Sequence, residues 1–405
     1  MRRTAIMVLL PLISLAAVNW LMNPLMLFNS PVIDGLNKYK TQLFFALHVV
    51  KPYWAREYDP QAVILGSSRA GNGMDPAMLD ATAFNYAIPG ARIDLLSRIY
   101  GDVRDGQALE KVILTLDFFA FNASPSAITL RDQAINMRLR GGDVRPGANL
   151  FSLTFNDHFN ALLSWQNTRN SLRTWRYQEA AATGEIGLIE YHRNGHWQQT
   201  LPRGRAQREN FRAIEREYMQ TGWFPPPLKT YTFESPEFAA FDELESLLRT
   251  LHADRREVFL VISPLHARFM LAMELAGLGE EFVFWKRELV RINAQVANFY
   301  DSAAYPLWDF AIATGPNLEE VPAAGDRATR MEYFLDGQHY TTALGSIILK
   351  RLDEPALMPG FGWQLSTDSL DSRLREAESL LTAYRISHPA DMQELSQTWR
   401  TVSGN

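Results

Sequence analysis

The sequence predicts an α/β fold with a central parallel sheet, a large and mostly helical insertion, and a helical C-terminal tail. Three short apolar runs, Ala62–Leu65, Ala83–Ile88 and Lys111–Leu116, alternate with helical patterns. Strands alternating with helices require crossover connections, which are right-handed and make the strands parallel. The chain has 405 residues, so one large domain with additions is expected.

The first strands and helices follow from local residue patterns. Ala62–Leu65 is a continuous apolar run bounded by turn residues, which is typical of a buried parallel strand. Asp75-Pro76 then resembles a helix N-cap followed by proline at the first helical position. The second strand, 83–88, closes at Pro89-Gly90, and apolar residues at helical spacing predict an amphipathic helix over 93–103.

The alternation breaks after the third strand. Residues 123–235 are rich in Arg, Asn, Gln and Trp and contain the break Pro225-Pro226-Pro227, so they are predicted to form the insertion. The sheet pattern then returns, and the main domain is expected to cover 61–360, with the tail over 361–405. The later elements are a helix over 241–252, a strand over 258–262, a helix over 281–298, a short strand over 307–310, a helix over 342–352, and tail helices over 369–385 and 391–402.

The amino terminus predicts a membrane anchor. Arg2 and Arg3 precede an apolar run over 5–21, which is at the short end for a membrane span and longer than a usual signal-peptide core. Two arginines favour a cytoplasmic amino end, so the body is expected outside the cytoplasm. A signal anchor over 1–28 is the first expectation and a cleaved signal peptide the alternative. Residues 29–60 are then a juxtamembrane connector, whose apolar part either packs on the body or lies at the membrane interface.

Composition narrows the classes of function. The net charge is −5, whereas a nucleic-acid surface needs a concentrated basic face, so no nucleic-acid partner is expected. The chain has no cysteine, which excludes disulfides, a zinc-thiolate site and a cysteine nucleophile. No glycine-rich phosphate loop follows a strand. His192 and His196 flank a predicted hairpin turn at Asn194-Gly195 without a carboxylate cluster, so neither a metal nor a cofactor is expected.

Two motifs carry possible chemistry. Gly66-Ser67-Ser68 follows the first strand, and Asp336 and His339 lie three residues apart near the other end of the chain. A serine hydroxyl is a poor nucleophile until a base removes its proton, and an acid must hold the histidine ring in the right tautomer. Together the motifs could supply all three groups. The backbone amides of Ser68 and Gly90 are candidate oxyanion donors.

Other strand ends offer further candidates, each with a structural alternative. Arg69 is a candidate for an anionic substrate group, or it pairs with a surface acid. His266 follows a strand, and it either lines the pocket or caps a loop. Tryptophans in the insertion could stack on sugar rings or pack in the core; they are Trp165, Trp175, Trp197 and Trp223.

The ordered motifs resemble the SGNH (GDSL-like) hydrolase superfamily. The likeness is closer to its membrane-anchored, extracytoplasmic branch, which includes the alginate O-acetylation proteins and the D-alanine transfer protein of teichoic acids. It covers about 61–122 and 255–350, and each motif is short. The resemblance implies a flavodoxin-like three-layer α/β/α sandwich and acyl-ester chemistry. Its motifs are Gly66-Ser67-Ser68, Asn85–Gly90, Leu116–Asn122 and Asp336-Gly337-Gln338-His339.

The resemblance assigns roles by position. Ser68 occupies the nucleophile slot, His339 that of the general base, and Asp336 that of the residue orienting the base. Gly90 matches the oxyanion glycine of the second block.

Two departures from the family pattern are visible. Ser67 replaces the usual aspartate, which leaves the choice between Ser67 and Ser68 open. Asp117 stands in the third block, where the family offers asparagine, and a carboxylate repels an oxyanion unless it is protonated. Asn122 is the substitute donor if its loop folds back.

The expected function combines these points. The sequence predicts a single-pass inner-membrane protein with a periplasmic body, acting as a serine O-acetyltransferase or acetylesterase on an exported polysaccharide or envelope glycan. The resemblance implies a membrane-bound acyltransferase as the supplier of acyl groups. The alternative is a non-catalytic glycan-binding or assembly subunit of a membrane complex. The separation of Ser68 and His339 discriminates between the two.

Overall fold

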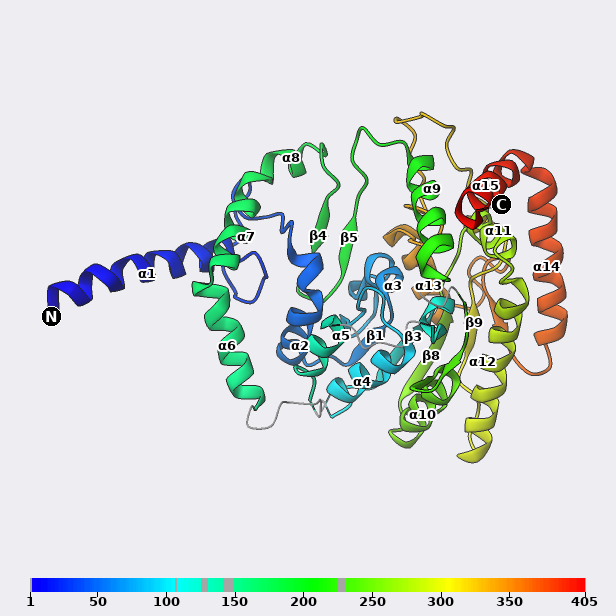
Figure 1. Cartoon of the computed structure of the whole chain (residues 1–405). Coiled ribbons are helices and arrows are strands. Elements are labelled where there is room, and N and C mark those ends of the chain that lie inside the picture. The colour runs from blue at the N-terminus through cyan, green and yellow to red at the C-terminus, as the bar shows by residue number, and fades with distance from the viewer. Residues whose placement is uncertain (1, 106–107, 125–129, 141–148, 225–229, 405) are drawn as a thin grey trace.

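A six-stranded sheet forms the centre of the molecule (Figure 1), and its strand order is β10-β9-β8-β3-β1-β2. The structure is a computed structural model that describes residues 2–105, 108–124, 130–140, 149–224 and 230–404. Every strand pair is parallel except β10 with β9. The predicted mixed α/β class with a mostly parallel central sheet is therefore confirmed.

The strands form where the continuous apolar runs occur. Every residue of β1 and of the edge strand β2 is buried, because helices cover the sheet. The antiparallel edge strand β10 was not predicted, since three residues are too few to show a periodic pattern. The strands are β1 Ala62–Leu65, β2 Ala83–Asn85, β3 Lys111–Leu116, β8 Glu257–Ile262, β9 Leu307–Asp309 and β10 Trp363–Leu365.

The β2 strand ends three residues earlier than predicted, at Asn85, yet the chain beyond it still follows β1. The amides of Tyr86 and Ile88 donate to the carbonyls of Ile64 and Gly66, at 2.8 and 2.9 Å. This pairing brings the turn after Ile88 beside the turn that carries the two serines.

The helices between the strands pack in two rows. In one row α10 lies between α4 and α12, and in another α3 contacts α13. The α4 helix forms as predicted, because its apolar residues at helical spacing all become buried. The bounds are α3 Ser68–Gly73, α4 Ile93–Val103, α10 Ala240–Ala253, α11 Ala267–Leu275, α12 Gly279–Phe299 and α13 Thr342–Asp353.

The described part of the segment between β3 and β8 is largely helical. Its hairpin places Trp197 against the nucleophile helix α3, where Gly71 leaves room: a Cβ on Gly71 would lie 1.8 Å from the indole. The predicted break at 225–227 lies outside the described residues. The elements are α5 Leu130–Asn136, α6 Leu150–Leu163, α7 Trp165–Arg176, α8 Gln178–Ala182, β4 Ile189–Tyr191, β5 Trp197–Gln199, α9 Gln207–Glu217, the π-helical turn Tyr218–Gly222, β6 Glu234–Ser235 and β7 Phe238–Ala239.

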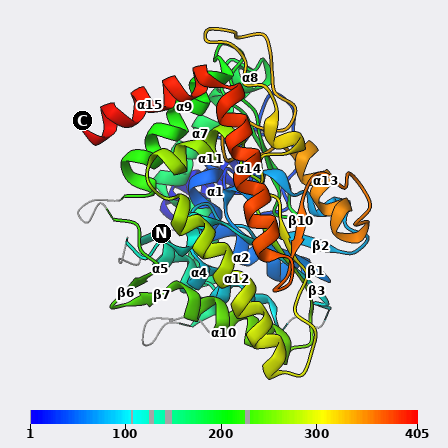
Figure 2. The same ribbon diagram turned by 90° about the vertical axis from the view of Figure 1, so that its right-hand side faces the viewer.

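The C-terminal tail forms two helices, α14 Leu370–Ser387 and α15 Pro389–Ser403, close to the ranges predicted. Figure 2 shows α14 running across one side of the molecule, and it contacts both α11 and α12. Buried charges hold α15 to the body. The guanidinium of Arg268 binds the carboxylates of Glu215 and Asp391, at 2.7 and 2.6 Å.

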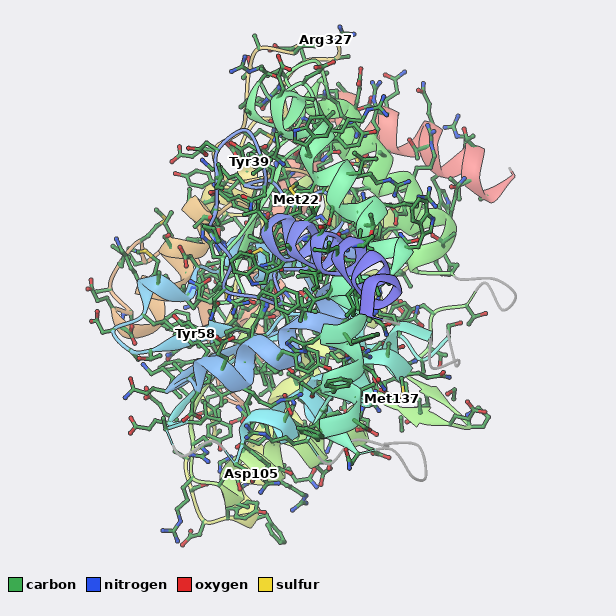
Figure 3. All side chains as sticks on the ribbon, turned by 90° about the vertical axis from the view of Figure 1, so that its left-hand side faces the viewer. Met22, Tyr39, Tyr58, Asp105, Met137 and Arg327 are labelled. Atoms are coloured by element: carbon green, nitrogen blue, oxygen red, sulfur yellow. The ribbon has the colours of Figure 1, made fainter. Side chains whose placement is uncertain are left out.

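The N-terminal helix α1, Arg2–Met22, extends away from the body (Figures 1 and 3), with Met22 at its inner end. Within the described ranges, no helix has the length and apolarity needed to cross a membrane. The predicted signal anchor over 1–28 and the predicted single-pass inner-membrane location are therefore wrong. The apolar run contains Pro11. The C-terminal end of α1 packs on the rest of the protein, where the buried side chain of Asn19 donates to Leu162 O at 2.7 Å.

The segment over 29–60 packs on the body, which was one of the two predicted alternatives. It contains a 3₁₀ turn, Leu43–Ala46, followed by α2, Leu47–Tyr58, and apolar residues of both are buried in the main core. The ammonium group of Lys51 on α2 is also buried and donates to the carbonyls of Asn85 and Ala87, each at 2.8 Å. This contact supports the segment that leads from β2 to Gly90.

Candidate active site

The nucleophile turn is formed by the end of β1 and the start of α3. Gly66 is required here because a Cβ would lie 1.9 Å from Thr115 Oγ1 on the neighbouring strand β3. Ser67 is the N-cap of α3, and its hydroxyl accepts a hydrogen bond from the Arg69 amide at 3.3 Å. Ser68 is therefore the first residue of the helix, and its side chain is partly exposed.

The Asp336–His339 loop is closed by backbone pairing and organised by the carboxylate. Phe334 and Tyr340 form an antiparallel bridge, and the amide of Leu335 donates to His339 O at 2.8 Å. Within the loop, Asp336 Oδ1 accepts hydrogen bonds from the amides of Gln338 and His339, both at 2.9 Å. The loop therefore holds both the carboxylate and the imidazole in fixed positions.

The fold brings the three predicted catalytic residues together. Ser68 Oγ lies 3.0 Å from His339 Nε2, although the two residues are 271 positions apart. His339 Nδ1 lies 2.8 Å from Asp336 Oδ2. The Asp336 side chain is 6% exposed and the His339 side chain 21% exposed, so the acid is buried while the ring can be reached from solvent. This is the geometry that a serine, base and acid need.

The protonation states follow from the contacts of Asp336. Burial raises the pKa of this carboxyl, but the attraction of His339 and hydrogen bonds from the ring and two backbone amides outweigh it and lower the pKa below its usual value. The ionised carboxylate can only accept, so Nδ1 of His339 carries the proton. In the neutral ring Nε2 is then an acceptor, and the Ser68 hydroxyl donates to it.

The structure places the two adjacent serines in different surroundings. The Ser67 hydroxyl is 1% exposed and donates to Asp117 Oδ2 at 2.5 Å. Only Ser68 lies within hydrogen-bond distance of His339. Ser68 therefore has a base beside it and access to solvent, whereas Ser67 has neither.

Arg69 does not face a substrate site. Its guanidinium is buried and donates to Asp117 Oδ1 at 3.1 Å and to Gln338 Oε1 at 2.6 Å. The ring of Phe119 lies 4.9 Å from the guanidinium carbon. The predicted pairing with an acid occurs, but that acid is buried rather than at the surface.

Gly90 lies in a turn that needs glycine. The amide of Ala91 donates to Ile88 O at 3.0 Å, Pro89 is the second residue of the turn, and Gly90 has φ +72°, which defines a type II turn. Gly90 is exposed, and within the described ranges its amide donates to no protein acceptor. The Ser68 amide is the first of its helix and has no acceptor within it. Both predicted oxyanion amides therefore remain available.

The third-block side chains are occupied by structural contacts. Both oxygens of Asp117 accept hydrogen bonds, one from Ser67 and one from Arg69. Asn122 is buried, and its amide group donates to Trp223 O at 3.2 Å while its oxygen accepts from the Ser124 amide at 3.0 Å. Asn122 fastens its own loop and makes no contact with the triad.

His266 contacts the catalytic loop through its backbone amide, and its side chain makes structural hydrogen bonds elsewhere. It is the N-cap of α11: Nδ1 accepts from the Arg268 amide at 3.2 Å, and Nε2 donates to Glu319 O at 2.7 Å. Burial lowers the pKa of His266 to about 4, so the ring is neutral. Its own amide donates to Gly337 O at 3.0 Å. The loop-capping alternative describes this residue, and it does not line the site.

The four tryptophans that were candidates for stacking on sugar rings fall into a buried pair and an exposed pair. Trp197 and Trp223 are core residues, each 1% exposed, whereas Trp165 and Trp175 on α7 are 76% and 56% exposed. The hairpin predicted at Asn194-Gly195 is present, with Gly195 at φ +84°. The described residues contain no cluster of three His, Cys, Asp or Glu side chains suited to a metal ion.

Gln338 and Asn72 help to hold the Asp336–His339 loop, and the sequence analysis assigned neither of them a role. Gln338 lies inside the recognised motif, but its partner Arg69 is distant in sequence. Asn72 donates to Tyr340 O at 2.6 Å from the face of α3 that carries Ser68, since it lies four residues further along the helix. That helical spacing is a signal that could have found Asn72.

Searches of protein-family models and of curated proteins find no match to this chain. The assignment of the site therefore depends on its geometry.

Proposed function

We propose that this protein is a serine-dependent acyl-ester enzyme, an O-acyltransferase or esterase. The observation that carries the proposal is the continuous hydrogen-bond chain from Ser68 Oγ to His339 Nε2 and from His339 Nδ1 to Asp336 Oδ2, at 3.0 and 2.8 Å. A partly exposed serine beside an imidazole whose other nitrogen is held by an ionised carboxylate is an activated nucleophile.

The reaction follows from these positions. Ser68 Oγ attacks the acyl carbon while its proton passes to His339 Nε2, and the imidazolium that forms is stabilised by Asp336. The carbon–oxygen bond to the leaving alcohol breaks as that oxygen takes the proton from Nε2, which leaves an acyl-enzyme. Water or an acceptor hydroxyl then loses its proton to Nε2 and attacks the acyl carbon, and Ser68 regains its proton as it leaves. The amides of Ser68 and Gly90 are the proposed donors to the oxyanion.

We also propose the finer fold assignment, a flavodoxin-like α/β/α sandwich of the SGNH type. The parallel strands run β2-β1-β3-β8-β9 across the sheet, which is the order 2-1-3-4-5 of flavodoxin-like folds. The two rows of helices are consistent with one layer on each face. Ser68 follows the carboxyl end of β1, the edge at which such sheets carry their ligands.

The acceptor class that we propose is a carbohydrate hydroxyl. An O-acyl ester of a carbohydrate hydroxyl is what the resemblance implies. The buried pairing of Arg69 removes the argument for an anionic group beside the nucleophile. The alternative, a non-catalytic binding or assembly subunit, is disfavoured by the short Ser68–His339 distance, because a binding role does not require it.

The test is covalent labelling of the purified full chain with a fluorophosphonate, followed by peptide mapping. We expect label on Ser68 and none in Ser68→Ala, with His339→Ala reducing the labelling rate by at least about 10³-fold. Ser67→Ala is the matched control and should label within about tenfold of the parent, since only a neighbouring hydroxyl is lost. No label on a folded parent protein, or label on Ser67, contradicts the proposal.

A further inference from the structure

A buried polar network links the segments that follow β1 and β3 to the Asp336–His339 loop. Asp117, after β3, accepts from Ser67 at 2.5 Å and from Arg69 at 3.1 Å. Arg69 reaches across to Gln338 at 2.6 Å. All four side chains are nearly inaccessible to solvent. We call this set, Ser67, Arg69, Asp117 and Gln338, the brace.

The brace binds the catalytic loop at the residue before His339, and a second contact binds the loop at the residue after it. Gln338 precedes His339 and accepts from Arg69, whereas Tyr340 follows it and its carbonyl accepts from Asn72 at 2.6 Å. Arg69 and Asn72 both lie on α3, one and four residues after Ser68. The helix that carries the nucleophile therefore holds the residues before and after the base.

Close packing of α3 against the catalytic loop and against α13 limits how far these segments can move relative to one another. A Cβ on Gly73 of α3 would lie 2.0 Å from the Tyr340 ring, and one on Gly345 of α13 would lie 1.7 Å from Gly73 O. The Tyr340 ring of the loop packs directly on α3, and α13 meets the backbone of α3 at Gly345. The side-chain contacts from Arg69 and Asn72 therefore act over a short, well-packed distance, and their loss should shift the loop rather than be absorbed by mobile side chains.

We propose that Arg69 and Asn72 are positioning residues that set the distance between Ser68 Oγ and His339 Nε2, and that Asp117 serves as the anchor of Arg69 instead of contributing to the oxyanion hole. The inference rests on the proposed function. Arginine suits this role because its planar fork can bind a carboxylate and an amide oxygen at once, which the single ammonium of lysine does less well.

Gln338 variants test the Arg69–Gln338 contact of the brace separately from its Arg69–Asp117 ion pair. Gln338→Met removes the acceptor of Arg69 but leaves the Arg69–Asp117 pair, and Gln338→Glu restores an acceptor. We expect Gln338→Met to slow fluorophosphonate labelling of Ser68 by about 10- to 100-fold, because small misplacements of catalytic groups have effects of this size. Gln338→Glu should recover the rate to within about threefold of the parent.

The second contact is tested with a matched pair of buried asparagines. Asn72→Leu removes the donor to Tyr340 O. Asn293→Leu removes a similar bond, from a buried amide to Tyr305 O at 2.8 Å, in a part of the fold that contacts neither Ser68 nor His339. Both substitutions should lower stability, but only Asn72→Leu should slow labelling, again by about 10- to 100-fold.

A second readout separates this inference from the proposed function. The proton on His339 Nδ1 gives a downfield NMR resonance when it is held by Asp336, and we expect Gln338→Met and Asn72→Leu to broaden or shift it while Asn293→Leu does not. Parental labelling rates and an unchanged resonance in folded Gln338→Met and Asn72→Leu overturn the inference. Failure of the parent to label overturns the proposed function instead, and the resonance then still decides whether the two residues position His339. If either variant does not fold, Arg69→Lys provides the same test.

Discussion

Two sets of side chains at the carboxyl end of the sheet contain the same kinds of group in different surroundings. In one, Ser68 bonds to His339, which bonds to Asp336; in the other, Ser67 and Arg69 both bond to Asp117. Each set joins a serine, a nitrogen-containing side chain and a buried carboxylate, and the two serines are adjacent in the chain. The first set is open to solvent at Ser68 and His339, and the second is closed.

The difference shows why we assign the proposed acyl transfer to Ser68 and not to Ser67. An imidazole can accept and return a proton near neutral pH, whereas the guanidinium of Arg69 stays protonated. The Ser67 hydroxyl donates to a carboxylate whose other oxygen is already held by that guanidinium. The second set is therefore suited to fixing geometry and the first to chemistry.

Replacing the carboxylate of each set by an amide should give the largest difference in acyl-transfer rate between the two sets. Asp336→Asn should lower acyl transfer by about 10⁴-fold with the fold retained, because the ring then favours the wrong tautomer. Asp117→Asn should lower it by less than about 10²-fold, since no reacting atom touches that side chain. The measurement is the rate of ester hydrolysis or fluorophosphonate labelling. Equal losses in the two variants contradict this division of roles.

Removal of Asp117 should have the largest effect on stability. Asp117→Ala leaves the buried guanidinium of Arg69 without its carboxylate, which typically costs about 3–5 kcal/mol of unfolding free energy. Urea denaturation measures the change. Asp371→Ala, which breaks the exposed pair between Arg287 and Asp371, is the control and should leave the midpoint unchanged within error. A loss in Asp117→Ala no larger than in this control argues against a buried brace.

As the pH falls, folding stability should be lost first through protonation of buried histidines and only at lower pH through protonation of Asp336. The pKa of His266 is lowered from 6.5 to about 4, so the unfolded state takes up a proton first and stability falls as the pH drops from about 6.5 to 4. The full shift corresponds to about 3 kcal/mol. The pKa of Asp336 is also lowered, but its contribution is present above the unfolded value near 4 and is lost only below that range.

Denaturation midpoints at pH 7, 5.5 and 4.5 measure this order. His266→Gln should be less stable than the parent at pH 7, because glutamine cannot reproduce both ring contacts, and its stability should fall less steeply between pH 7 and 4.5. His48 and His196, whose pKa values burial also lowers to about 4, should account for the remaining slope. A slope as steep in His266→Gln as in the parent rules out His266 as a main acid-sensitive group.

Substituting Gly66 and substituting Gly90 by alanine should lower the unfolding free energy by different amounts, because the two glycines are needed for different physical reasons. Gly66→Ala places a Cβ against Thr115 Oγ1 and should cost about 1–3 kcal/mol through overpacking. Gly90→Ala meets open space and should cost about 1 kcal/mol, because only the positive φ is unfavourable. Adding Thr115→Ala should reduce the cost of Gly66→Ala and leave that of Gly90→Ala unchanged, which a double-mutant cycle measures. Equal coupling to both glycines contradicts the steric explanation for Gly66.

The local patterns of the chain predicted the five parallel strands of the sheet and the candidates for the serine, base and acid of the site. Strands such as β1 and β3 form where continuous apolar runs end in turn residues, and those patterns lie within a few neighbouring positions. The order of the motifs along the chain, together with the carboxyl-end rule for parallel strands, brought Ser68, Asp336 and His339 into one hypothesis. The N-terminal apolar run misled, because its length could be counted but the contacts of Asn19 with the body could not.

The roles of the polar residues around the triad depended on the tertiary structure. Ser67 and Ser68 have the same side chain and adjacent positions, and they differ only in what the fold places opposite them: Asp117 for one and His339 for the other. The same holds for Arg69, whose partners come from β3 and from the far end of the chain. Strand pairing and helix packing set these distances between residues remote in sequence, so local patterns carry no record of which buried polar group will meet which partner.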